Sequence, residues 1–157
     1  MNRKRCIRYA NEKDIRTLTE FNMALAAETE GITLNSEKVE AGVAHVISHP
    51  EMGFYLVAED DNRIEGSLLI TPEWSDWRNG FFWWIQSVYV TPDNRRKGVY
   101  RDLYTHVLKL GADVSNVCGY RLYVERNNLA AQKTYEILGM RKSDYVMYER
   151  EINPLER

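Results

Sequence analysis

The stretch VYVTPDNRRKGVYRDLY, residues 88–104, decides how this chain folds and what it binds. It begins with β-branched and aromatic residues that predict the end of a strand, passes through a proline turn, and places three cations, residues 95–97, directly before Gly98. The apolar residues that follow recur at helical spacing. A glycine lets the backbone come close to a ligand, and the first N–H groups of a helix have no partner within it. The stretch therefore predicts an anion site, for phosphate above all, where a strand meets a helix; the alternative is a solvated basic turn.

The composition bounds the kind of protein that surrounds this stretch. The 157 residues are 44% apolar and 28% charged, which is typical of a globular protein and predicts a single domain over residues 1–157. The net charge of -2 provides no overall basic field. Neither nucleic acid nor a membrane is therefore expected as a partner, and the anion site must be local.

Cysteine usage and hydropathy indicate the compartment. Cys6 and Cys118 lie far apart and form no C-x-x-C pair, which favours reduced thiols and a cytoplasmic setting. No apolar run follows the basic N-terminus, so no secretory signal is expected, and the run over residues 81–85 is far shorter than the ~20 residues of a spanning helix. We also expect no metal, because His45 and His49 have helical spacing but no third ligand.

Hydrophobic periodicity and turn residues divide the rest of the chain into strands and helices. Residues 72–80 are expected to form a loop, and residues 27–31 an acidic turn between the first two helices. Strands are predicted over residues 6–9, 53–59, 63–71, 81–90 and 119–124, with a last strand or hairpin over 140–152. Helices are predicted over residues 12–27, from the cap Asn35 or Ser36 to Pro50, after Gly98, and over 129–138.

The order of these elements predicts an α+β fold, with a mixed and mostly antiparallel sheet of about six to seven strands flanked by four helices. The strand, helix, strand order around residues 88–104 predicts one parallel pair joined by a crossover. Ligands of such sheets bind where neighbouring strands part at their carboxyl ends. The end of the 81–90 strand is therefore the expected site.

Two motifs in this frame resemble those of the GNAT superfamily of N-acetyltransferases, which use acetyl-CoA. The first is an R/Q-x-x-G-x-G/A loop after a strand that ends in V-x-P; it matches residues 95–100, with Tyr100 where glycine or alanine is usual. The second motif is N-x-x-A-x-x-x-Y-x-x-x-G-F, with methionine for the last aromatic, and it is matched at Asn128, Ala131, Tyr135 and Gly139. Either motif alone occurs by chance, but the two together, at this spacing, imply a GNAT-like fold over about residues 6–152.

The resemblance implies how acetyl-CoA would bind. Its pantetheine arm would pair with the backbone of residues 88–90 like an added strand, where an N–H can face the thioester oxygen. Its pyrophosphate would lie on the N–H groups of residues 96–100. Asn128 matches the position that contacts the pantetheine arm, and a plain helix cap is an equally good interpretation. The implied binding residues are Val88, Tyr89, Val90, Arg95, Arg96, Lys97, Gly98, Val99, Tyr100, Arg101, Asn128 and Tyr135.

The resemblance also implies catalytic roles. Tyr135 matches the family tyrosine that protonates the departing thiolate, and a pKa of about 10 keeps it protonated at neutral pH; helical spacing alone would make it a core aromatic. Presenting an alkyl amine in its neutral form at pH 7 costs roughly 4 to 5 kcal/mol unless the site helps. Many family members carry a carboxylate on the strand before the loop, but residues 83–87 include none. Our hypothesis is that Glu28 or Glu30 accepts the proton, directly or through water; a solvated acidic turn is the alternative.

The acceptor remains open at this stage. The resemblance implies direct attack by a primary amine, on a small molecule or a peptide, in a ternary complex with acetyl-CoA, and it allows a homodimer. The missing strand carboxylate keeps a second function open, a non-catalytic module that binds or senses acyl-CoA. An RNA-associated protein that uses the basic loop is disfavoured by the net charge. An aromatic wall for the acceptor, or alternatively part of the core, is predicted for Trp74, Trp77, Trp83 and Trp84.

Overall fold

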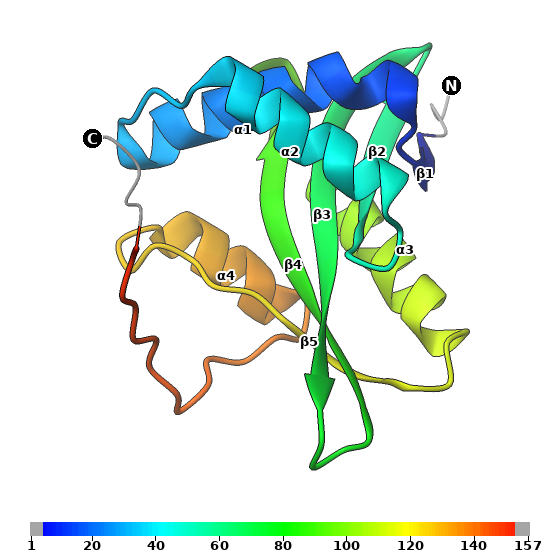
Figure 1. Ribbon diagram of the computed structural model, residues 1–157, viewed down its shortest axis with the longest axis vertical. Helices are drawn as coiled ribbons and strands as arrows, with labels where there is room; N and C mark the ends of the chain where they lie inside the picture. The colour runs from blue at the N-terminus through cyan, green and yellow to red at the C-terminus, as the bar shows by residue number, and fades with distance from the viewer. Residues whose placement is uncertain (1–4, 153–157) are drawn as a thin grey trace.

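The centre of the computed structural model, which describes residues 5–152, is a sheet of five strands in the order β1-β2-β3-β4-β5. Strands β1 to β4 pair antiparallel with one another in this order, and β5 pairs parallel with β4. The predicted mixed sheet with one parallel pair is therefore confirmed. The strands are β1 (Cys6–Tyr9), β2 (Phe54–Asp60), β3 (Arg63–Ser75), β4 (Gly80–Val90) and β5 (Val117–Arg121), as labelled in Figure 1.

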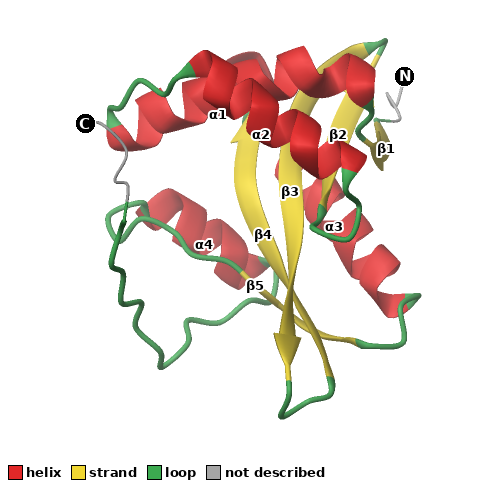
Figure 2. Ribbon diagram, viewed as in Figure 1, coloured by secondary structure: helices red, strands yellow, loops and turns green. Residues whose placement is uncertain are grey.

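Four helices surround this sheet, as predicted: α1 (Ile15–Glu30), α2 (Ser36–Ser48), α3 (Val99–Ala112) and α4 (Leu129–Ile137). Helices α1 and α2 cross one face of the sheet, whereas α3 lies behind it (Figure 2). Asparagine caps start two of them, because Asn35 Oδ1 accepts a hydrogen bond from Lys38 N at 2.9 Å and Asn128 Oδ1 accepts one from Ala131 N at 3.2 Å.

The core is built on both faces of the sheet by alternation along the strands. In β2, Leu56 and Ala58 point to the α3 side, and Tyr55 and Val57 point to the α1 and α2 side. Leu103 of α3 is completely buried against the first group. This packing fixes α3, and with it the loop that precedes α3, relative to β4.

The prediction of six to seven strands is wrong, because residues 140–152 form no strand. The segment leaves α4 and runs along the outside of the molecule (Figure 2). Its aromatic and β-branched side chains suit a strand, but a strand also needs a partner edge, and pairing between distant segments is invisible in a local pattern. The side chains of Tyr145 and Tyr148 are consequently exposed.

The prediction of a loop over residues 72–80 is confirmed only for residues 76–79, which form a turn, and is wrong for residues 72–75 and Gly80. Strand β3 continues to Ser75 and pairs with β4, with Pro72 opposite Trp83. The proline disfavoured a strand at this point because it has no N–H to donate. Strand β2 pairs with β3 only as far as Ile70, so Pro72 lies on a part of β3 that has one neighbour and can tolerate the missing donor.

The first helix differs from its predicted bounds at both ends. Residues Glu12–Asp14 form a 3-10 turn after the predicted cap. Asn11 Oδ1 accepts a hydrogen bond from Lys13 N, and Asp14 Oδ2 accepts one from Asn11 N. Helix α1 then continues to Glu30 and ends at Gly31, whose φ of 68° is left-handed. Glu28 and Glu30 therefore lie in the last turn of α1 and not in a connecting turn. Strand β5 likewise lies slightly earlier than the predicted residues 119–124.

Candidate functional site

The carboxyl-terminal half of β4 has an open edge. Strand β5 pairs only with residues 81–84 of β4, whereas β3 accompanies β4 as far as Val90. Within residues 5–152, no strand pairs with residues 85–90 on the β5 side. The backbone predicted to receive the pantetheine arm, residues 88–90, lies on this open edge.

A β-bulge in the pairing of β3 with β4 marks the place where β4 separates from β5. The register between β3 and β4 shifts between Ser67 and Leu69, opposite Ser87, whose φ of 48° is left-handed. A bulge bends and twists its strand, and bulges are common beside active sites. The bulge therefore accounts for the divergence of β4 from β5 at the point where a ligand is expected.

The start of α3 presents free backbone donors next to this edge. Gly98 precedes the helix with a φ of 81°, and no side chain caps it. The first hydrogen bond of the helix runs from Asp102 N to the Gly98 carbonyl oxygen at 3.0 Å, so the N–H groups of residues 99–101 precede it. A Cβ at Gly98 would lie 2.9 Å from Nη2 of Arg101. The glycine therefore fits both a left-handed turn and a crowded approach.

The cations of the loop divide into two groups. Arg95 is engaged within the protein, because its Nε donates to the Val90 carbonyl oxygen at 3.0 Å and its Nη2 lies 2.5 Å from Glu28 Oε2. Arg96 and Lys97 are exposed, and the described residues offer them no acceptor. The side chain of Arg101 is 69% exposed, and the 3.9 Å between its Nε and Asp102 Oδ1 is long for an ion pair. Three of the four cations are therefore available to an anion at the helix start.

Glu28 lies at the open end of β4. Its carboxylate accepts a hydrogen bond from Tyr89 Oη at 3.2 Å as well as the contact from Arg95, and Phe21 of the same helix packs on the Tyr89 ring at 4.8 Å. Burial and the neighbouring Glu28 raise the pKa of the Tyr89 hydroxyl. Glu30 is exposed, and no described residue pairs with it. The structure thus brings one of the two predicted bases to the site.

Tyr135 of α4 contacts the start of α3. Its ring lies edge-on to that of Tyr100, with 5.5 Å between the centroids and 68° between the planes. Burial raises the pKa of Tyr135, which keeps the phenol protonated at neutral pH. Asn128 is exposed and caps α4, so the cap interpretation is confirmed, and the contact with pantetheine stays a prediction.

The tryptophans do not form the predicted wall. Trp83 is 9% exposed and packs in the core between Phe54 and Tyr120. Trp74 and Trp77 lie at the far end of the long β3–β4 hairpin, because Trp74 pairs with Phe81, seven positions before Val88. At about 3.3 Å per residue, this separation exceeds ~20 Å. Trp84 is half-buried beside Tyr123, whose ring centroid is 6.0 Å away.

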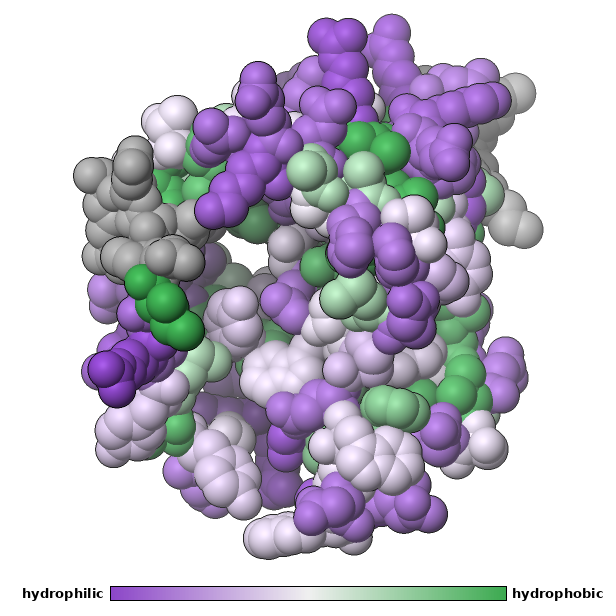
Figure 3. Space-filling view, in the orientation of Figure 1, coloured by the Kyte–Doolittle hydropathy of each residue, from purple (hydrophilic) through white to green (hydrophobic). Residues whose placement is uncertain are grey.

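The site is a hollow in the molecular surface. In the space-filling view the surface is hollowed left of centre, beside the end of β4 and between α1 and α4 as these lie in Figure 1 (Figure 3). Sequence reasoning missed the contact from Glu28 to Arg95 and Tyr89, which joins α1 to β4 and to the loop that follows it. The signal that could have found it is the helical register of α1, which repeats Phe21, Leu25 and Glu28 on one side.

The described residues contain neither a metal-binding cluster nor a membrane-spanning helix. Within residues 5–152, no group of three or more His, Cys, Asp or Glu side chains is placed to hold a metal ion. None of the helices in that range is long and apolar enough to cross a membrane.

Comparison with known proteins places this geometry in context. The chain matches the acetyltransferase (GNAT) family over residues 6–140. A possible acetyltransferase from Clostridium difficile 630 is 41% identical, with a TM-score of 0.89 over 96% of this chain and 99% of the other. No curated protein matches the chain.

Two more distant structures share the fold. A predicted acetyltransferase from Clostridium acetobutylicum, solved with acetyl-CoA, is 17% identical, with a TM-score of 0.76 over 94% of this chain and 96% of the other. AAC(6')-Iy in complex with the bisubstrate analogue CoA-S-monomethyl-acetylneamine is 16% identical, with a TM-score of 0.75 over 94% of this chain and 98% of the other. At these identities the similarity is one of fold.

Proposed function

This chain belongs to the GNAT family of acetyltransferases, and from that premise we propose that it transfers the acetyl group of acetyl-CoA to a primary amine. The amine, of a small molecule or a peptide, attacks directly within a ternary complex. The observation that carries the proposal is the open edge of β4 beside the uncapped start of α3. An extended amide arm fits the first, and a diphosphate fits the second.

The residues of this chain divide the work of holding acetyl-CoA. The backbone of residues 88–90 pairs with the pantetheine arm. The N–H groups of residues 96–100 donate hydrogen bonds to the pyrophosphate, and Arg96, Lys97 and Arg101 add positive charge. Asn128, at the start of α4, contacts the arm with the part of its amide that the cap leaves free. Acetyl-CoA supplies a thioester that is activated for attack by an amine.

Two side chains move protons in this proposal. Tyr135 holds a proton on Oη and gives it to the departing sulfur. Its raised pKa keeps the phenol protonated at neutral pH, so the proton is available. Glu28 takes a proton from the amine, because its carboxylate lies at the end of β4, in contact with Tyr89 and Arg95. Glu30 is the alternative base, and its exposure without a described partner makes it the weaker one.

Enzyme assays of three variants test these roles. Release of free thiol from acetyl-CoA is measured with a panel of polyamines, amino acids, aminoglycosides and peptides. We expect Tyr135→Phe to lower kcat by about 100-fold or more, and Glu28→Gln to lower it at least ~10-fold. Glu30→Gln, on the same turn of α1, should change kcat less than two-fold, as a rough bound.

Glu28→Gln also removes the ion pair with Arg95, so a second control is needed. Arg95→Gln removes the same pair and keeps the carboxylate, so its kcat should fall less than that of Glu28→Gln. If Glu28→Gln and Arg95→Gln behave alike, Glu28 orients the loop and is not the base.

Two observations favour a second function. Strand β4, Gly80–Val90, carries no carboxylate, and Glu28 is already engaged by Arg95. A module that binds acyl-CoA without turnover would also have these features. If calorimetry shows binding of acetyl-CoA while no amine of the panel is acetylated, the non-catalytic module replaces the enzyme.

We also propose that the protein forms a homodimer. Strand β5 ends the sheet with one neighbour, and residues 144–149 offer strand-forming side chains but pair with no strand among the described residues. The segment of one copy can add to the β5 edge of a second copy.

A further inference from the structure

The hydroxyl of Tyr100 is buried without a partner. Among residues 5–152 it is the one buried side-chain oxygen or nitrogen that makes no hydrogen bond. Buried hydroxyls almost always have a partner, since an unpaired one loses its water without compensation. Phenylalanine would fill the same space without this penalty, so the oxygen itself needs an explanation.

Tyr100 also departs from the pattern of its loop, in which this position is usually glycine or alanine. The side chain reaches from the first turn of α3 to α4, where its ring contacts that of Tyr135 with 5.5 Å between centroids. On its other side it stacks with Tyr104 at 6.0 Å. The large residue thus fills the space between the phosphate-binding helix and the residue proposed to donate the proton.

Burial acts on the pKa of both phenols in the same direction. Burial raises the pKa of Tyr100, and negative charge on Tyr135 and on Tyr104, the titratable groups that act on it, raises it further. Burial alone raises the pKa of Tyr135. Both phenols are therefore protonated at neutral pH, so the hydroxyl of Tyr100 is able to donate a hydrogen bond.

Resting on the function proposed above, we propose that Tyr100 positions Tyr135 for proton donation. Its ring fixes the ring of Tyr135, and its hydroxyl donates a hydrogen bond to Tyr135 Oη once that oxygen has lost its proton. In this step the O–H bond of Tyr135 breaks as an S–H bond forms, and the negative charge passes from sulfur to Tyr135 Oη. The hydroxyl that lacks a partner in the resting protein gains one when the charge appears.

The variant Tyr100→Phe tests the proposal without opening a cavity. We expect kcat to fall about ten-fold, because hydrogen bonds to charged groups are the strong ones, while both KM values stay within about two-fold. The melting temperature should stay the same or rise, since an unpaired buried hydroxyl is removed. Slower turnover in an equally stable protein is a result that a purely structural role of Tyr100 does not give.

A second measurement does not depend on turnover. Fluorotyrosine is placed at position 135, where its more acidic phenol titrates within the stable range of the protein, and its 19F signal is followed against pH. Tyr100→Phe should raise the pKa of this phenol, because the phenolate loses a donor. Tyr104→Phe, on the next turn of α3, is the matched control and should change neither this pKa nor kcat.

The outcomes separate the two proposals. An unchanged pKa at position 135 in Tyr100→Phe overturns the positioning role, whatever the activity. A raised pKa in a protein that acetylates no amine supports the positioning role and contradicts the proposed function. A fall in both melting temperature and kcat, with a higher KM, would make Tyr100 a packing residue only.

Discussion

Gly98 meets two demands at the start of α3, and its substitution is the sharpest test of the phosphate site proposed there. We expect Gly98→Ala to destabilise the protein by about 1 to 2 kcal/mol, because a φ of 81° is unfavourable for any residue with a Cβ. The new Cβ meets the flexible end of Arg101, which can move away. The added methyl group should still weaken acetyl-CoA binding, by roughly ten-fold if the backbone turn shifts. Denaturant unfolding and calorimetry measure the two effects.

Gly42 provides the matched control for Gly98. It lies exposed within α2, has no positive φ, and a Cβ there would meet nothing within 4 Å. Gly42→Ala should therefore stabilise the protein by about 0.5 to 1 kcal/mol and leave acetyl-CoA binding unchanged. Equal effects of the two substitutions would show that the loop has no special need for glycine.

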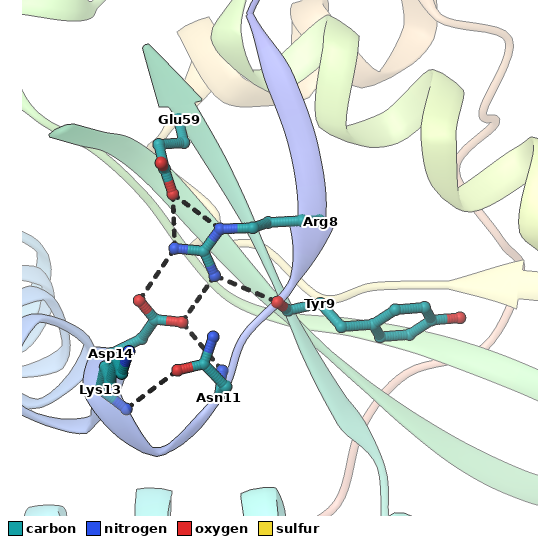
Figure 4. A network of polar contacts seen from close by, with 6 residues as sticks. All are labelled: Arg8, Tyr9, Asn11, Lys13, Asp14 and Glu59. Carbon is teal, nitrogen blue, oxygen red and sulfur yellow. Dashed lines mark hydrogen bonds and ion pairs between the residues drawn. The ribbon is translucent and has the colours of Figure 1, made fainter. Parts of the chain in front are cut away.

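At the scale of elements, a network of ions joins β1, the turn before α1, and β2 (Figure 4). Arg8 donates to Asp14 Oδ2 at 2.7 Å and Oδ1 at 3.0 Å, and its Nη2 lies 2.5 Å from Glu59 Oε2. Burial raises the pKa of Asp14, but hydrogen bonds from Arg8 and the Asn11 N–H, with the charge of Arg8, outweigh it and lower the pKa overall. The pKa of Arg8 is raised, chiefly by the hydrogen bonds to Asp14. The network is therefore favourable while Asp14 is ionised.

Asp14→Asn should lower the free energy of unfolding by about 2 kcal/mol at pH 7, because it leaves half-buried Arg8 with fewer ionic partners. Since the pKa of Asp14 is lowered by folding, its contribution is complete above the unfolded value of about 3.9 and is lost as pH falls through the folded value. Denaturant unfolding from pH 7 to pH 3 should show the wild type and variant converging.

The control for this prediction is Glu20→Gln, which breaks an exposed pair with Arg16 on α1. Such pairs contribute within about 0.5 kcal/mol, so the variant should unfold like the wild type at every pH. A difference between wild type and Asp14→Asn that persists unchanged at pH 3 would assign the loss to packing.

The elements also show what a sequence can and cannot predict. Helix starts followed from local chemistry, since Asn35 and Asn128 make the predicted caps, and Gly139, with a φ of 94°, follows α4 as expected. The two motifs located the loop and α4 correctly. Strand ends depended on distant partners: Pro72 is tolerated because β2 has already ended, and residues 140–152 lack a partner edge. The contact between Tyr100 and Tyr135 joins two helices, so neither motif alone could reveal it.

At the scale of the whole molecule, apolar surface is concentrated in the segment after α4. Tyr145 is 80% exposed, Tyr148 92% and Ile152 91%, whereas the edge of β5 has no neighbour among the described residues. An aromatic side chain buries about 150 to 250 Å² when covered, so this segment alone supplies much of one partner's share of a standard interface. Exposed strand edges and strand-forming segments of this kind pair between chains.

We therefore expect light scattering to show a homodimer at micromolar concentration, with residues 144–149 of each copy added to β5 of the other. Tyr148→Asp and Val146→Asp should shift the protein to the monomer, because each places a charge in the paired segment. Trp77→Asp, at an equally exposed aromatic on the β3–β4 turn, is the control and should leave the dimer intact. A monomer in the wild type, or a dimer indifferent to both substitutions in the segment, would refute strand addition. Because β5 borders the open edge of β4, a confirmed dimer would also place a second copy beside the proposed acetyl-CoA site and make activity depend on protein concentration.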